Sequence, residues 1–458
     1  MKLPLDPHFV AATQWNAAFE RDVRASGDTA TQVVIGLLRH NQAVVRQTLH
    51  ILPGNDPRNF TYVERRLKAL CWAYGGHRIL IDGPSDLVKA LQQHYAQSPT
   101  GQFDSELIGE KIYGAPISVE AARAEEIPEA VTDHQAIGRH LDGCRIGFDL
   151  GGSDRKCAAL IDGEVVFSEE IKWDPYFQTD PEYHFDGIMD SLRRAAAHLP
   201  RVDAIGGSAA GVYVDNEVRV ASLFRGVGPD DFNTRVRPIF HRVREAWDGI
   251  PFVVINDGEV TALAGAMSLN VSALLGVSLG TSTAAGYVTP AGTLTTWLNE
   301  LAFVPVDYRP DGPVDEWSGD VGCAVQFFSQ QGVARLAKEA GWDFDAQMPL
   351  AERLVAVQDA MKQDDPRARA IFSTIGVCFG HTIAHWTSLY TIQHLLILGR
   401  VTSGAGGDLI LDCARTTLQE QYPSLAEQMA LHIPDEKMKR HGQAVAAASL
   451  PAISKESP

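Results

Sequence analysis

A repeated strand-turn-strand pattern constrains the fold of this chain more than any other feature. The segment RIGFDLGGSDRKCAALIDGEV, from Arg145, aligns without gaps with LLGVSLGTSTAAGYVTPAGTL, from Leu274. The alignment pairs Gly147 with Gly276, Leu150 with Leu279, Gly151 with Gly280, Ser153 with Ser282 and Gly163 with Gly292. Each copy reads as an apolar strand, a glycine-containing turn with a hydroxyl, and a second strand. Two such hairpins with the same tip chemistry predict two related domains.

The length and composition are those of a globular protein with several domains. The chain has 458 residues, of which 45% are hydrophobic and 21% are charged. At roughly 100–200 residues per domain, two or three domains are expected. The cysteines occur singly, without a CxxC pair, as is typical where thiols stay reduced. We therefore expect a cytoplasmic location and neither a disulfide framework nor a cysteine zinc site.

The charge balance excludes several classes of partner. There are 40 Lys and Arg residues against 57 Asp and Glu residues, so the formal net charge is −17. Such a chain repels polyanions, which disfavours nucleic acids and anionic membranes as partners. No apolar run approaches the roughly 18 residues that a membrane span requires.

Residues 1–140 are expected to form a small α+β module of unknown role. Residues 33–52 alternate around His40 to Gln42, which predicts two strands joined by a tight turn. Residues 62–74 have helical periodicity, and residues 77–83 follow as a strand. The acidic stretch 118–135, interrupted by Pro128, is interpreted as a connector.

The two repeated tips suit phosphate oxygens. Gly151, Gly152 and Ser153 form one tip, and Gly280, Thr281 and Ser282 form the other. Glycine removes the Cβ that would hold a ligand away from backbone N–H groups. The alternative, that each tip is an ordinary hairpin turn, stays open. Asp149 precedes the first tip, and one carboxylate beside a phosphate loop is what a Mg²⁺ site needs, usually through water.

A second carboxylate lies where a predicted strand meets a predicted helix. The apolar run 252–255 is followed by Asn256 and Asp257, and a helix is expected to begin near Glu259. Asp257 could be an N-cap, which is a common role of Asp at this position. It could also be the base that deprotonates an attacking hydroxyl in phosphoryl transfer.

A third glycine-rich element follows a predicted strand at residues 395–398. Its loop contains Gly399, Gly404, Gly406 and Gly407, and a helix is expected from about Asp408. Backbone amides at the start of a helix favour anions or a flat adenine-ribose. Many α/β turns have this pattern, so it is weak evidence by itself.

In this order, the segments FDLGGS, GVSLGTSTAAG and LILGRVTSGAGGDLIL resemble the ROK family of sugar kinases, within the superfamily of actin and hexokinase. The resemblance covers about residues 145–451. It implies an α/β fold of the actin-like ATPase (ribonuclease H-like) type with duplicated domains. The first domain would comprise 141–255 and 436–458, the second 256–435, and the N-terminal α+β module would be an addition.

The resemblance also implies an activity and a set of site residues. It implies ATP-dependent phosphorylation of a sugar hydroxyl, with Asp257 as the general base and Asp149 carrying Mg²⁺ through water. The two tips would bind the phosphates of ATP, and Gly399, Gly406 and Gly407 would lie against the adenosine. The sugar contacts implied by the family pattern are Asn256, Glu300, Gly211 and Asp215. A homodimer is an expectation from the family alone.

Three departures from the family pattern limit these implications. Phe303 stands where the family usually has a histidine, which follows Glu300 by three residues. The cysteine-rich zinc segment is reduced to SGDVGCAVQFFS with Cys323 alone, so we expect no zinc site. Val325 replaces a glutamate that contacts sugar, which leaves the identity of the sugar open.

Two other functions remain as alternatives. A sensor that binds sugar without turnover is favoured by the missing sugar contacts and opposed by the intact Asp149 and Asp257. A sugar-independent ATPase is the other alternative. Ser208 lacks the pattern of a nucleophile elbow, so a hydrolase triad has no support.

Overall fold

The computed structural model describes residues 3–131, 137–433 and 436–453. The chain forms two compact units. The first unit comprises Met1–Asp133, Val277–Ala285 and Trp297–His432, and the second comprises His134–Gly276, Gly286–Thr296 and Ile433–Pro458. This division into two units does not test the domain boundaries expected from the sequence, at residues 140, 255 and 435, which remain predictions.

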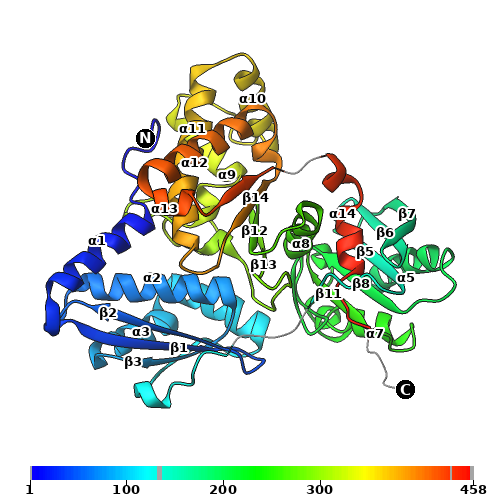
Figure 1. The fold of residues 1–458 in the computed structure, drawn as a ribbon, viewed down its shortest axis with the longest axis horizontal. Coiled ribbons are helices and arrows are strands. Elements are labelled where there is room, and N and C mark those ends of the chain that lie inside the picture. The colour runs from blue at the N-terminus through cyan, green and yellow to red at the C-terminus, as the bar shows by residue number, and fades with distance from the viewer. Residues whose placement is uncertain (1–2, 132–136, 434–435, 454–458) are drawn as a thin grey trace. The chain divides into compact units, whose positions relative to one another are not determined.

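The N-terminal part of the first unit is a four-stranded sheet with helices (Figure 1). The sheet has the strand order β2-β1-β3-β4. Its elements are α1 (Ala12–Ala25), β1 (Thr31–Leu38), β2 (Val44–Ile51), α2 (Pro57–Tyr74), β3 (Arg78–Asp82), α3 (Ser85–Gln97), α4 (Pro99–Asp104), the π-helical segment η2 (Ser105–Tyr113) and β4 (Ser118–Ala121). The antiparallel pairing of β1 with β2 confirms the predicted hairpin.

Helix α2 has a capping residue at each end. The Asp56 side chain accepts a hydrogen bond of 2.9 Å from the Arg58 N–H, and Pro57 occupies the first helical turn. Gly75 ends the helix with a φ of +76°, which favours glycine. The helix and the strand predicted for residues 62–83 are therefore confirmed.

The interpretation of residues 118–135 as a connector is wrong for their first four residues. These residues form β4, which pairs in parallel with β3 at the edge of the sheet. The segment is short and only Val119 among its four residues is buried, so it has no clear strand pattern.

The rest of the first unit consists of helices and part of a second sheet. Its helices are α9 (Gln330–Glu339), α10 (Leu350–Lys362), α11 (Pro366–Trp386), α12 (Ala405–Gln421) and α13 (Pro423–Ala426). The sheet has the order β13-β12-β14-β15. Its strands are β12 (Leu274–Leu279), β13 (Thr283–Val288), β14 (His394–Leu398) and β15 (Ala430–His432). The tip between β12 and β13 belongs to the first unit.

The second unit is built on a five-stranded sheet with the order β11-β8-β5-β6-β7. Strands β11, β8 and β5 are parallel, whereas β6 and β7 continue the sheet in antiparallel pairs. The elements are β5 (Cys144–Leu150), β6 (Asp154–Ile161), β7 (Glu164–Lys172), α5 (Pro181–Ala196), β8 (Ala204–Ala209), β9 (Val212–Val214), β10 (Glu217–Val220), α6 (Pro229–Asp231), α7 (Ile239–Glu245), β11 (Phe252–Asn256), α8 (Asp257–Leu269) and α14 (Glu436–Ala448). The hairpins β5–β6 and β12–β13 confirm the predicted strand-turn-strand repeat.

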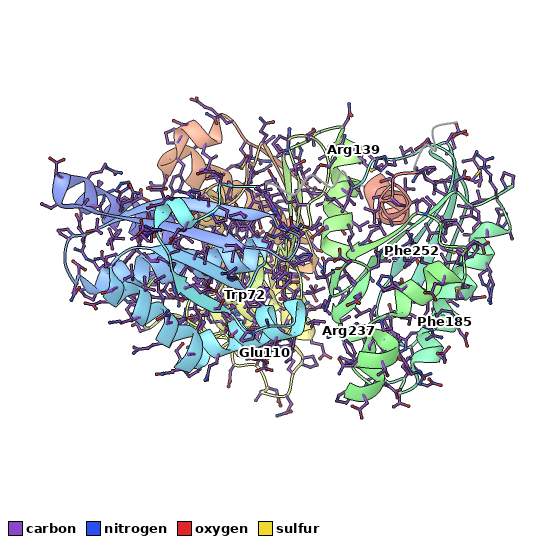
Figure 2. All side chains as sticks on the ribbon, turned by 90° about the horizontal axis from the view of Figure 1, so that it is seen from below. Trp72, Glu110, Arg139, Phe185, Arg237 and Phe252 are labelled. Carbon is purple, nitrogen blue, oxygen red and sulfur yellow. The ribbon has the colours of Figure 1, made fainter. Side chains whose placement is uncertain are left out.

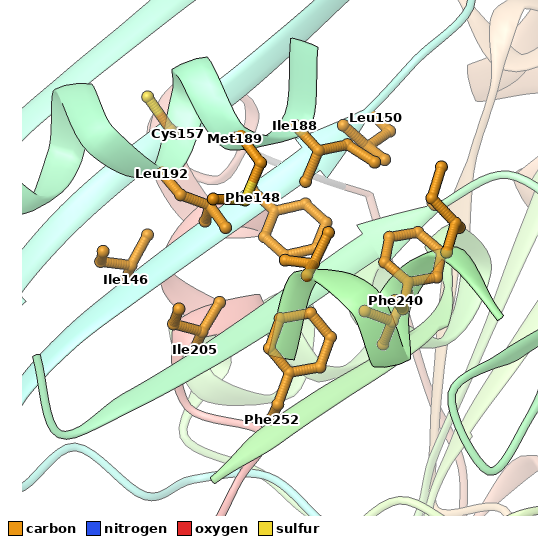
Figure 3. Close-up of a cluster of buried hydrophobic side chains, with 14 of the residues drawn as sticks. Ile146, Phe148, Leu150, Cys157, Ile188, Met189, Leu192, Ile205, Phe240 and Phe252 are labelled. Atoms are coloured by element: carbon orange, nitrogen blue, oxygen red, sulfur yellow. The ribbon is translucent and has the colours of Figure 1, made fainter. Parts of the chain in front are cut away.

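Alternation along β5 sends its side chains to two faces of the sheet. Ile146, Phe148 and Leu150 join a buried apolar cluster with α5, α7 and β11 (Figure 3). Gly147 faces the other way, toward α14 (Figure 1). This cluster fixes the strands whose ends carry the candidate site.

None of the helices in the described part of the chain combines the length and the apolar composition that crossing a membrane requires.

Candidate functional site

The ends of three parallel strands bring polar side chains together in the second unit. The register places Asp149 of β5 opposite Ser208 of β8, and Ser208 opposite Ile255 of β11. Asp257 follows two residues after Ile255, at the start of α8. The carboxyl ends of parallel strands are the usual ligand-binding edge of α/β sheets. Two predicted site residues, Asp149 and Asp257, therefore lie at the same edge of the sheet, with β8 between the strands that lead to them.

Asp149 is a nearly buried carboxyl group with few partners. Its side chain is 8% exposed. The Ser208 hydroxyl donates a hydrogen bond of 2.6 Å to Oδ1, and the Lys156 Nζ lies 4.0 Å from Oδ2. Burial raises the pKa of Asp149 to about 6, against the opposing effects of Ser208 and Lys156, and the charge of Asp257 contributes to the rise.

Asp257 is the first residue of α8, and its pKa is also raised. Burial raises the pKa of Asp257, although a hydrogen bond from the Gly258 N–H, at 3.0 Å, opposes the rise. The helix begins two residues earlier than the sequence predicted. Its N-cap is Asn256, whose Oδ1 accepts from the Gly258 N–H at 2.7 Å. The reading of Asp257 as the N-cap is therefore wrong.

The Asn256 side chain also connects α8 to a neighbouring loop. Its Nδ2 donates to the Gly211 carbonyl oxygen at 2.7 Å, so these two predicted sugar contacts lie together beside Asp257. Asp215 lies in the turn between β9 and β10. The side chain of the next residue, Asn216, bonds the backbone of Phe252 and Val254 in β11. The role of Asp215 as a sugar contact stays a prediction.

The first predicted tip is a short turn fixed by aromatic residues. The Gly151 N–H donates to the Asp154 carbonyl at 2.9 Å, and the Gly151 carbonyl accepts from the Trp173 indole at 2.8 Å. The Ser153 hydroxyl donates to the Asp154 carboxylate at 2.8 Å. A Cβ on Gly152 would lie 1.9 Å from the Tyr176 hydroxyl. The Tyr176 side chain thus lies against Gly152 and would have to move if a larger residue stood there.

The second predicted tip, in the first unit, is open around its glycine. The Gly280 N–H donates to the Ser282 carbonyl and the Gly280 carbonyl accepts from the Gln330 N–H, both at 2.9 Å. A Cβ on Gly280 would meet nothing nearer than 3.7 Å. Thr281 and Ser282 are exposed. The tip therefore offers hydroxyl groups and an accessible backbone to a ligand.

The predicted adenosine segment lies next to this second tip. Gly399 ends β14 with a φ of +103°, and a Cβ there would lie 2.4 Å from the Leu279 carbonyl oxygen. Close packing also explains the glycines that follow, because a Cβ would lie 2.7 Å from the Phe372 ring at Gly406 and 1.9 Å from the Thr402 carbonyl oxygen at Gly407. Helix α12 begins at Ala405, three residues earlier than predicted.

Glu300, the remaining predicted sugar contact, belongs to the first unit and lies beside the last turn of α2. Its N–H donates to the Trp72 carbonyl at 3.0 Å. Phe303, in the position where the family pattern has histidine, stacks on the Trp72 ring with the centroids 4.3 Å apart. Figure 2 labels Trp72 among the side chains of this unit.

The predicted residues therefore form two groups. Asp149, Asn256, Asp257, Gly211 and the first tip belong to the second unit, whereas Gly280, Gly399, Glu300 and their neighbours belong to the first. The arrangement of one group against the other stays a prediction.

Sequence reasoning considered Ser208 only as a hydrolase nucleophile and missed its place beside Asp149, to which this fully buried residue is bonded. One feature of the sequence could have indicated the pairing of β5 with β8: both strands contain an Ile-Gly pair. The parallel register aligns Ile146-Gly147 of β5 with Ile205-Gly206 of β8. This match could have placed Ser208 beside Asp149.

The donors of the second unit fit Mg²⁺ better than a transition metal. Carboxylate and hydroxyl oxygens are hard ligands, and Mg²⁺ usually binds one or two carboxylates, several waters and substrate phosphates. Among residues 3–131, 137–433 and 436–453, no three His, Cys, Asp or Glu side chains form a group that could hold a metal ion by themselves. The absence of zinc stays a prediction.

The sheets and the repeated hairpins define an α/β protein with the actin-like ATPase fold of ROK sugar kinases. The crystal structure of the ROK hexokinase from Thermus thermophilus matches 67% of this chain and 97% of its own, with a TM-score of 0.53 and 18% identity. At this identity the likeness establishes the fold alone.

Two further solved structures match with a TM-score of 0.48 each. One is a ROK family glucokinase from Streptomyces griseus in complex with glucose and AMPPNP, with 22% identity over 68% of this chain and 99% of its own. The other is a ROK family transcriptional regulator, with 18% identity over 68% of this chain and 79% of its own. No family model and no curated protein matches the sequence.

Proposed function

We propose that this chain catalyses the ATP-dependent phosphorylation of a sugar hydroxyl, on a hexose or a related sugar. The observation that carries the proposal is the pair Asp149 and Asp257 at the carboxyl edge of the β11-β8-β5 sheet. Both carboxyl groups have a pKa raised by burial, as is common for groups that act on protons or bind a cation.

In the proposed reaction, the sugar hydroxyl oxygen forms a bond to the γ-phosphorus of ATP while the bond to the ADP oxygen breaks. Asp257 accepts the proton of that hydroxyl, because a raised pKa suits a base that works near neutral pH. Mg²⁺, held by Asp149 through water, would neutralise phosphate charge. Asn256 orients Asp257 by capping α8.

The sequence resemblance implies that both groups of loops would contribute to the proposed site. The tips 151–153 and 280–282 would donate hydrogen bonds to the phosphates, and the turn at Gly399, Gly406 and Gly407 would lie against adenosine. Glu300, Asn256 and Gly211 would contact the sugar, whereas Asp215 rests on the sequence resemblance alone. A cytoplasmic location and a homodimer belong to the same proposal.

The test is the release of ADP over a panel of hexoses, amino sugars and polyols. We expect sugar-dependent ADP release that falls by about 10²–10⁴-fold in Asp257→Asn, since a positioned base contributes about that much. Asp180→Asn is the matched control, because Asp180 also lies at the start of a helix in the second unit and its carboxylate pairs with Arg235. This control should keep the parent rate.

A sugar sensor without turnover is the alternative that one observation favours. The Phe303 ring stacks on Trp72, and it has no polar group that could bond a sugar. Saturable sugar binding without ADP release would support the sensor and contradict the kinase. ADP release that is independent of sugar would contradict both.

A further inference from the structure

A buried cluster of charges connects α2 to a loop that is far away in the sequence. Lys68 is fully buried, and its Nζ lies 3.0 Å from both carboxylate oxygens of Asp104 and 2.9 Å from Asp320 Oδ2. Arg65, one turn earlier on α2, donates from Nη1 to both oxygens of Asp320, at 3.0 and 2.9 Å. Asp320 thus has two cationic partners, both from the N-terminal module.

These charges stabilise the structure only as a complete set. Burial alone raises the pKa of a carboxyl group, but Lys68 and Arg65 outweigh burial at Asp320 and bring its pKa down to about 2. Asp320 is therefore ionised at neutral pH. Removing one partner of a buried pair leaves an uncompensated charge, which is strongly unfavourable.

The last turn of α2 makes a second set of contacts with the same region. The carbonyl oxygens of Ala73 and Trp72 accept from the N–H groups of Asn299 and Glu300, at 2.9 and 3.0 Å. The Trp72 indole donates to Asp104 at 3.0 Å, and its ring stacks on Phe303. One helix thus fixes both the Glu300 segment and Asp320.

The Glu300 segment and the Asp320 loop are also bonded to each other. The Val306 N–H donates to the Gly322 carbonyl at 2.8 Å, and the Ala324 N–H donates to the Val304 carbonyl at 3.0 Å. Within the loop, the Asp315 N–H donates to the Asp320 carbonyl at 2.8 Å. A displacement of Asp320 would therefore reach the segment that carries Glu300.

We propose that the N-terminal module is an integral part of the sugar site, in which the ion pairs of Arg65 and Lys68 with Asp320 fix residues 299–324 and thereby position Glu300. Arg65, Lys68 and Asp320 are positioning residues in this scheme, since they act through Glu300. The scheme rests on the proposed sugar kinase function, and it assigns a role to α2 of the N-terminal module.

The test uses the full chain with the substitution Asp320→Asn, which keeps the shape of the side chain and removes its charge. Hydrogen exchange read by mass spectrometry reports the order of residues 299–324. Steady-state kinetics report the KM for the sugar, the KM for ATP and kcat. The control is Glu120→Gln, which removes an exposed ion pair with Arg78 in the same module.

We expect Asp320→Asn to raise exchange in residues 299–324 and to raise the KM for the sugar about tenfold, equivalent to about 1.4 kcal/mol. The KM for ATP and kcat should stay within about twofold of the parent, and Glu120→Gln should change none of these values. If Asp320→Asn does not fold, Arg65→Gln removes only one of the two partners and is read in the same way.

The exchange and kinetic measurements distinguish two kinds of failure. Unchanged exchange and an unchanged KM for the sugar, in a parent that phosphorylates sugars, would overturn the positioning role and leave the kinase function intact. A parent without sugar-dependent ADP release would refute the kinase function. In that case, exchange that rises only in residues 299–324 would still support the role of the module in fixing this loop, and unchanged exchange would overturn it.

Discussion

At the scale of single residues, the buried carboxyl groups of Asp320 and Asp149 differ in their partners. Asp320 has two cationic partners that lower its pKa to about 2. Asp149 accepts from a hydroxyl and lies 4.0 Å from the ammonium of Lys156, which is nearer to Asp154, and burial raises the pKa of Asp149 to about 6. A buried acid whose partners do not offset its burial is suited to a mobile cation, whereas a fully paired acid serves the fold.

The raised pKa of Asp149 predicts a pH-dependent response to Mg²⁺. In the folded protein this carboxyl group is mostly neutral below pH 6 and ionised above it. Because the raised pKa belongs to the folded state, ionisation costs stability as the pH rises from about 4 to 6, by about 3 kcal/mol at 1.36 kcal/mol per pKa unit. Mg²⁺ should offset this cost and raise the melting temperature at pH 7.5 but not at pH 5.

Thermal unfolding with and without Mg²⁺ at the two pH values measures this effect. Asp149→Asn should abolish the stabilisation, and the exposed Asp186→Asn in the same unit should retain it. Equal stabilisation of the parent at both pH values would be evidence against a cation at Asp149.

The sequence predicted the position of some site residues and missed the reason for others. An apolar strand followed by Asn256-Asp257 is a local pattern, so the polar end of β11 was predictable. Ser208 depends on the register between two strands that are about 60 residues apart, which no local pattern encodes. The glycines at 152, 406 and 407 were assigned to ligand approach, although their closest neighbours are other parts of the chain.

At the scale of secondary structure elements, two glycines allow α14 to lie directly on the sheet of the second unit. A Cβ on Gly147 of β5 would lie 1.8 Å from the Ala444 carbonyl oxygen, and a Cβ on Gly206 of β8 would lie 1.7 Å from that of Ala447. Gln443 of α14 also donates to the Thr261 hydroxyl of α8 at 3.0 Å. The helix thus supports the elements that carry Asp149 and Asp257.

The substitution Gly206→Ala should therefore displace α14 and lower the free energy of unfolding by about 1–3 kcal/mol, the usual effect of overpacking. A methyl group cannot be accommodated, because its nearest neighbours are backbone atoms. Denaturant unfolding, together with protease cleavage near α14, measures the effect. The control is Gly228→Ala, where a Cβ would meet no atom within 4 Å and φ is −66°. Equal stability of both variants would contradict the packing argument.

Local patterns also explain which elements the sequence predicted. The β1–β2 hairpin and α2 are specified by alternation, by helical periodicity and by the residues at their ends. Strand β4 depends on parallel pairing with β3 across α3 and α4, and only one of its four residues is buried. Its pairing is a tertiary property that the acidic composition of the segment conceals.

At the scale of the whole molecule, the repeat revealed the fold but not the attachment of the N-terminal module. Two aligned hairpins predicted a duplicated α/β architecture, and the matched structures have that fold. One of the contacts that attach the module is the ion pair between Arg65 and Asp320, which are separated by 255 residues. Single charged residues occur throughout the chain, so no pattern indicates which of them form buried pairs.

The charge of the whole molecule gives a prediction that separates a sugar enzyme from a DNA-binding regulator. With a formal net charge of −17, the chain should be repelled by a polyanion unless a local basic surface compensates. Proteins that bind DNA non-specifically do so with a Kd of about 10⁻⁴–10⁻⁶ M, and their affinity rises as salt is lowered. We expect that about 10 µM protein does not change the fluorescence anisotropy of a labelled duplex of about 30 base pairs. The measurement is made in about 50 mM and about 200 mM KCl, a range over which non-specific DNA binding depends strongly on salt. Binding that strengthens at the lower salt concentration would show that the charge distribution, rather than the net charge, governs the partners of this chain.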